Sequence, residues 1–184
     1  MHKSVISSAG LALILGTCLT STASSPLHAA KEAAASCSSA SYHAMDFRVG
    51  SFTGITLGGL PAGRSEVKKI LSGCALIEHW DGAISGSGMG FYYWNPSDER
   101  WHLRYVNDDG QILEFEGVAD RDGISFTGSG RFYDYIGQHH MRWERVNADQ
   151  VRQIWHYSND DGRNWNSVVK IDLTRSPPKQ PADG

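Results

Sequence analysis

The stretch WHLRYVNDDGQILEFEGV, residues 101–118, carries the features that decide the fold. Residues 101–107 alternate between aromatic or apolar side chains and polar ones, which is the period-two pattern of a β-strand. The Asn-Asp-Asp-Gly at 107–110 supplies side chains that bond to their own backbone and a glycine that tolerates positive φ. A second run follows at 112–118. The stretch therefore predicts a β-hairpin with a tight turn, and it lacks the ligand series and closing Glu of a helix-loop-helix calcium site.

The same pattern continues in both directions, and no segment shows an apolar helical stripe. Twenty glycines against six prolines fit many tight turns between short strands. A meander of about ten strands removes its edges best by closing on itself. We therefore expect an all-β fold with a single closed antiparallel lipocalin-like barrel, whose strands lie near 46–55, 64–71, 75–81, 89–94, 101–107, 112–118, 124–127, 138–145, 150–158 and 165–174.

The segment 158–165, Ser-Asn-Asp-Asp-Gly-Arg-Asn-Trp, resembles an Asp-box, the pattern Ser-x-Asp-x-Gly-x-Thr-Trp, with Asn164 at the Thr position. In proteins that carry it, the motif forms a β-hairpin in which Asp caps backbone donors and Trp packs beneath. It recurs in sialidases without being catalytic there. It therefore supports the fold and not a glycosidase activity.

The first 30 residues have the order of a secretory signal peptide, with Lys3 before a short apolar run and small residues up to Ala30. An uncleaved anchor is one alternative, and lipidation at Cys18 is another. Export predicts a periplasmic or secreted protein, with no membrane association unless Cys18 is lipidated. Residues 31–42 are expected to be a linker or arm, 43–175 the barrel, and 176–184 a disordered, proline-rich tail.

Removal of the signal peptide leaves two cysteines, Cys37 and Cys74. An even pair in an exported protein predicts a disulfide between them. Two free thiols are the alternative. A metal site made by two isolated cysteines is less favoured, because no paired motif accompanies them.

Alternation also assigns the faces of the strands. Polar residues such as His79, His102 and Arg152 suit solvent, so the opposite faces are expected to point inward. Arg142 and Trp143 point opposite ways, and only one of them can be inward. The inward sets are Leu76, Glu78 and Trp80; Trp101, Leu103 and Tyr105; and Val151, Gln153, Trp155 and Tyr157.

These faces place a carboxylate and an amide among aromatic rings, which is the usual composition of a small-molecule site. We expect an exported barrel that binds a small, largely apolar ligand in its lumen, with ligand-binding residues Glu78, Trp80, Tyr105, Arg142, Gln153 and Trp155. One alternative is an isomerase or hydrolase that uses Glu78 as acid or base. Another is a filled barrel with a structural or interaction role, in which Glu78, Gln153 and Arg142 form a buried hydrogen-bond network.

Other classes are disfavoured. A formal net charge of -3 gives no basic surface for nucleic acid. Six histidines follow the signal peptide and suggest a haem or metal site. Surface positions are favoured over ligands, because three of the six lie on outward faces and the adjacent His139 and His140 point to opposite faces. No nucleophile motif or paired carboxylates are found, so catalytic residues stay unassigned and no cofactor is expected.

Several short motifs, in order, resemble a family of exported bacterial barrels with a lipocalin-like fold. They include 45–50, 73–80, 101–107, 142–143 and 151–155, so that the resemblance covers about 37–175. It implies a closed barrel of about ten strands and no particular activity. The chain departs from the family pattern at Arg48 and Phe52, in place of tryptophans, and at Leu103, Tyr105 and Asn107. If these positions face the lumen, the cavity of this chain is lined differently from that of the family.

Overall fold

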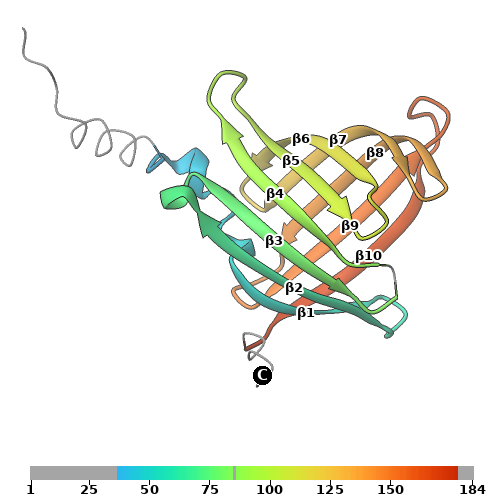
Figure 1. Ribbon diagram of the computed structural model, residues 1–184, viewed down its shortest axis with the longest axis horizontal. Helices are drawn as coiled ribbons and strands as arrows, with labels where there is room; N and C mark the ends of the chain where they lie inside the picture. Colours follow the sequence, from blue (N-terminus) through green and yellow to red (C-terminus); the bar gives the residue numbers. More distant parts are fainter. Residues whose placement is uncertain (1–36, 85, 178–184) are drawn as a thin grey trace, which may run out of the picture.

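The computed structural model describes residues 37–84 and 86–177, and they form a closed barrel of ten antiparallel strands (Figure 1). This confirms the predicted fold class. The strands are β1 (Gly50–Thr56), β2 (Pro61–Ile70), β3 (Ala75–Gly82), β4 (Gly88–Asn95), β5 (Arg100–Asn107), β6 (Ile112–Asp120), β7 (Gly123–Phe132), β8 (Tyr135–Arg145), β9 (Gln150–Ser158) and β10 (Asn166–Arg175).

Each strand pairs with the next one along the chain, and β1 pairs with β10 to close the sheet. The closing register joins Phe52 to Arg175 and Thr56 to Ile171. Closure pairs the first strand with the last, so neither β1 nor β10 is a free edge strand that could pair with another chain. Among the described residues, no helix has both the length and the apolar character needed to cross a bilayer.

The first strand begins later than the sequence pattern predicted. Asp46–Arg48 is a short 3-10 helix, η2, and the strand starts only at Gly50. The amide of Arg48 donates to the carbonyl of Met45 at 2.9 Å, and this turn buries both side chains. The prediction of a strand from residue 46 is therefore wrong, because tertiary burial of Arg48 overrides the alternating pattern.

The short helices cover one end of the barrel. Three short helices lie at this end, together with the β4–β5 connection, as Figure 1 shows: η1 (Ala40–His43), η2 and η3 (Leu71–Gly73). The indole N–H of Trp101 donates to the carbonyl of Ser41 at 3.2 Å. The predicted disulfide is present between Cys37 and Cys74, whose Cα atoms are 5.1 Å apart. The arm is thus fixed to the barrel, and this end is closed.

The opposite end carries the β1–β2, β3–β4, β5–β6, β7–β8 and β9–β10 connections. The last of these is the Asp-box-like turn. Its Ser158 hydroxyl accepts from the Gly162 amide at 2.9 Å, and Asp160 Oδ1 accepts from the Asn164 amide at 2.9 Å. Hydrogen bonds from the backbone and side-chain amides of Asn164, and from the Ser158 hydroxyl, lower the pKa of Asp160 to about 2. The Trp165 ring lies against the turn, 3.6 Å from the position that a Cβ atom would take at Gly162, and it also contacts His140. Trp165 remains 44% exposed.

The predicted signal peptide 1–30 with Cys18, most of the predicted linker 31–42, and residues 178–184 of the predicted tail lie outside the described residues. The described strands run from residue 50 to residue 175.

Candidate functional site: a cavity in the barrel lumen

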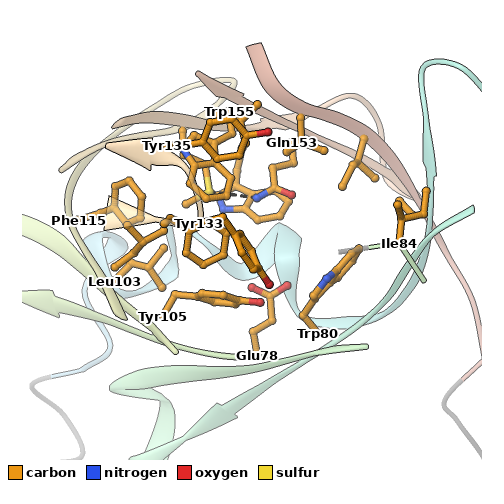
Figure 2. A pocket seen from close by; sticks show the side chains of 18 of the residues that line it. Glu78, Trp80, Ile84, Leu103, Tyr105, Phe115, Tyr133, Tyr135, Gln153 and Trp155 are labelled. Carbon is orange, nitrogen blue, oxygen red and sulfur yellow. Dashed lines mark hydrogen bonds between the residues drawn. The ribbon is translucent and has the colours of Figure 1, made fainter. Parts of the chain in front are cut away.

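The barrel is not filled. A cavity of about 330 Å³ lies inside it, toward the end that the helices leave uncovered (Figure 2). Nine aromatic rings line it, together with eight aliphatic side chains or methionine and only three non-aromatic polar residues. The rings belong to Trp80, Tyr92, Tyr105, Phe115, Phe132, Tyr133, Tyr135, Trp143 and Trp155, and the polar residues are Thr56, Glu78 and Gln153.

Five of the six residues predicted to bind a ligand line this cavity, and in Figure 2 they surround it from opposite sides. They come from β3, β5 and β9, strands that are far apart in the sequence and meet only because the sheet closes. The five are Glu78, Trp80, Tyr105, Gln153 and Trp155.

The predicted position of Arg142 is wrong. Its guanidinium lies on the outer face of β8 and binds the carboxylate of Asp120 with two hydrogen bonds of 2.6 and 2.9 Å. The neighbouring Trp143 points inward instead and is buried. A charged side chain reaches a charged partner and solvent from the outer face, whereas an indole fills the lumen without an ion pair.

Glu78 lies at the floor of the cavity and is only 3% exposed. Its Oε1 accepts hydrogen bonds from Arg48 and from the Ser65 hydroxyl, and its Oε2 accepts one from the Tyr92 hydroxyl. A carboxylate offers about four acceptor sites. Three are therefore used by the protein, and Oε2 keeps one for a donor in the cavity.

This arrangement sets the charge state of the floor. Burial raises the pKa of Glu78, but the Arg48 guanidinium and the hydrogen bonds from Ser65, Tyr92 and Arg48 outweigh it, so that the pKa lies below its usual value. Burial and the Glu78 charge raise the pKa of Tyr92 well above its usual value. At neutral pH the floor therefore holds an ionised carboxylate and a neutral phenol.

Arg48 is the other half of this ion pair, and it is 1% exposed. Its guanidinium carbon lies 3.6 Å from the centroid of the Trp143 ring, a stacked cation–π contact. Within residues 37–84 and 86–177, neither its Nε and Nη1 nor the Trp143 indole nitrogen has a hydrogen-bond partner. Stacking thus replaces hydrogen bonds on one side of the guanidinium, and Trp143 separates the charge from the cavity.

The sequence pattern correctly predicted that Glu78 points into the lumen, but not which residues it binds. The expected network joined Glu78 to Gln153 and Arg142, whereas the observed one uses Arg48, Ser65 and Tyr92. One signal was available. A charged residue, Arg48, stands where the family resemblance has a tryptophan, directly before an apolar-rich strand.

Trp155 lies on the side of the cavity opposite Glu78 (Figure 2). Its indole N–H donates to Nδ1 of His139 at 3.2 Å, and its ring packs edge-on or tilted against Phe115 and Phe132. The Gln153 side chain donates to the sulfur of Met141 at 3.1 Å, a weak acceptor. Gln153 is therefore a second polar group that a ligand can engage.

His139 is buried, which corrects the expectation of surface histidines at this position. Because Nδ1 accepts from Trp155, the ring is neutral with its proton on Nε2, which faces the carbonyl of Gly130 at 3.4 Å. Burial lowers the pKa of His139, with smaller opposing effects of hydrogen bonds to Gly130 and Tyr135.

A base whose pKa is lower when folded stabilises the protein above its unfolded pKa, about 6.5, and this stability is lost as pH falls. We expect the free energy of unfolding to decrease between pH 7 and pH 5, and to decrease less in His139→Gln, whose amide keeps an acceptor for Trp155. Urea titrations at both pH values measure this. His140, whose pKa burial also lowers, is the same in both proteins. An equal decrease in the two proteins would show that His139 does not titrate as described.

The chemistry available here is limited. In the described ranges 37–84 and 86–177, no group of three or more His, Cys, Asp or Glu side chains is placed to hold a metal ion. The one carboxylate of the lumen is ionised and held by three donors, so it is a poor general acid and a weak base. The site is suited to binding by shape and apolar contact, with one or two polar anchors.

Comparison with protein-family models finds no match to this chain, and a search of curated proteins finds no significant sequence similarity.

Proposed function

We propose that this protein binds a small, largely apolar molecule in the lumen of its barrel, without chemical change. The observation that carries the proposal is the cavity of about 330 Å³, which is lined by nine aromatic rings and by few polar groups. Its size falls at the lower end of ligand pockets, and its composition is that of sites that take compact apolar ligands.

The polar anchors define the ligand further. The free acceptor site on Glu78 Oε2 favours a ligand with an N–H or O–H donor, and the Gln153 amide is a second partner within the same cavity. An anionic head group at the floor is disfavoured, because the carboxylate would repel it and Trp143 covers the Arg48 guanidinium.

The alternative functions have less support. A filled barrel with a structural role would need side chains that occupy the space above Glu78. An enzyme using Glu78 as a general acid or base would need a carboxyl whose pKa is raised toward neutrality, whereas the pKa of this one is lowered.

We also propose that the protein is exported to the periplasm or the cell exterior and belongs to the lipocalin-like family that its motifs resemble. The Cys37–Cys74 disulfide supports export, because such bonds persist in oxidising compartments. The closed ten-strand barrel supports the resemblance.

Titration with N-phenyl-1-naphthylamine, a neutral apolar fluorophore with one N–H group, tests the binding proposal. We expect saturable binding of one probe per protein. Val168→Trp, at the wall of the cavity, is expected to weaken binding at least about tenfold by filling the space. Val146→Trp is the matched control, because Val146 is exposed in the turn after β8, at the closed end.

Thermal unfolding of both variants shows whether each is folded before binding is compared. If probe fluorescence does not saturate, or if both tryptophan variants bind as the unmodified protein does, the lumen is not the binding site.

A further inference from the structure

The barrel wall is incomplete at one place. The ladder between β6 and β7 stops at the pair Phe115–Gly128. Beyond it, residues 112–114 of β6 pair only with β5, and residues 129–132 of β7 pair only with β8. The two strands therefore separate toward the open end, and their backbones leave a lateral gap in an otherwise continuous sheet.

Glycine keeps this gap free of side chains on the β7 side. Gly128 and Gly130 occupy inward positions between Phe126 and Phe132. A methyl group at Gly128 would lie 2.2 Å from the carbonyl oxygen of Glu114, so only glycine fits there. From β6, the side chain of Leu113 reaches toward Gly130 and is buried. Side chains of β6 alone therefore fill the gap.

The gap lies between two hollow spaces. A groove of about 840 Å³ lies against the outer surface, lined among others by Glu114, Gly128 and Ser129. Leu103 and Phe115 line both this groove and the lumen cavity. Figure 2 shows these two side chains next to each other at one wall of the cavity. They are the two residues that both spaces share, and Phe115 pairs with Gly128 at the last step of the β6–β7 ladder, next to the gap.

Two hydrogen bonds to Tyr133 hold the strands together at the end of the gap. The Gln111 side-chain oxygen accepts from the backbone N–H of Tyr133 at 2.9 Å, and the side-chain amide of Asn107 donates to the Tyr133 hydroxyl at 3.1 Å. Tyr133 has a φ of +52°, a conformation that non-glycine residues rarely adopt. This bridge joins the β5–β6 connection to the β7–β8 turn at the end of the two strands where their ladder is missing.

We propose that the gap between β6 and β7, rather than the uncovered end of the barrel, is the passage through which the ligand reaches the lumen, with Phe115 and Leu113 as its gate. This inference rests on the proposed binding function and adds the route by which the ligand enters the lumen. The ligand would first contact the outer groove and then pass inward as the two side chains rotate, while the paired strands on either side stay in place.

Cross-linking the gap tests the route. Glu114 and Ser129 face each other across it if the register is continued, and both are exposed. Glu114→Cys/Ser129→Cys, joined by a short bis-methanethiosulfonate reagent, would hold the strands together. The matched control is Glu116→Cys/Thr127→Cys, a pair that already lies in register on the same two strands. The single-cysteine variants account for loss of each side chain, including the Arg104–Glu114 ion pair.

The readout is the rate of association and dissociation of N-phenyl-1-naphthylamine in stopped-flow fluorescence. Across the gap, we expect the cross-link to slow both rates by about tenfold or more with little change in Kd, as for a gated site. The control cross-link should leave them unchanged. Unchanged rates in the gap-linked protein, with normal affinity, would overturn the passage and leave the binding proposal intact. Absence of binding in the unmodified protein would instead remove the binding proposal and the passage with it.

Discussion

Glu78→Leu is expected to destabilise the protein by about 3–5 kcal/mol, because it leaves the Arg48 guanidinium buried without its counter-charge. Arg48 is 1% exposed and two of its nitrogen atoms already lack hydrogen-bond partners among the described residues. Without Glu78 it keeps one neutral acceptor, the Ser65 hydroxyl, 3.4 Å from Nη2. Equilibrium unfolding in urea measures the change. Glu116→Leu is the control, since Glu116 is exposed on the outer face and its loss should cost less than about 1 kcal/mol.

The double variant Arg48→Met/Glu78→Leu makes this prediction specific to the pair. Replacing both charges by apolar side chains of similar size is often neutral or stabilising, so the double variant should recover most of the loss. Tyr92 and Ser65 lose an acceptor in both variants, which makes the comparison fair. A loss in Glu78→Leu no larger than in Glu116→Leu would contradict a fixed, desolvated ion pair at the floor.

Cys37→Ser/Cys74→Ser is expected to lose about 3–4 kcal/mol, because the disulfide closes a loop of 37 residues and limits the unfolded chain. The loop contains β1 and β2, so without the bond the first two strands and the helices at the closed end would gain freedom together. Urea unfolding of the variant, compared with the unmodified protein before and after reduction, measures the effect.

The reduced protein should match the serine variant, since both lack only the cross-link. If oxidised and reduced protein unfold at the same urea concentration, the disulfide does not constrain the unfolded chain. In that case the arm would be held to the barrel by contacts such as the Trp101–Ser41 hydrogen bond alone.

The strands were predictable because one face of nearly every strand is buried and the other is not. In β5, for example, Trp101 and Leu103 are buried while Arg104 is exposed, and the sequence alternates accordingly. The Asn-Asp-Asp-Gly turns marked the ends of strands. The pattern failed where tertiary contacts decide the backbone: Arg48 is drawn into a 3-10 turn, and β7 runs on to Phe132 beyond the predicted end at residue 127.

The site was predictable in part for the same reason. Alternation placed Glu78, Trp80 and Gln153 inward, because each shares a face with buried apolar neighbours. It could not decide between Arg142 and Trp143, since both orientations fit the period. It also could not reveal that Arg48 pairs with Glu78, because that contact depends on how the segment before β1 crosses the closed end of the barrel.

The ion pair and the ligand cavity are adjacent parts of the same lumen, since Glu78 belongs to both. The Arg48–Glu78 ion pair joins the segment before β1 to β3 at the floor of the cavity, and aromatic side chains above it line a space for an apolar ligand. The most direct measurement is a crystal structure of the protein soaked with N-phenyl-1-naphthylamine. We expect density for one probe inside the barrel, between Phe115 and Trp155 and above Glu78. A lumen packed with side chains, or a probe bound only on the outer surface, would contradict it.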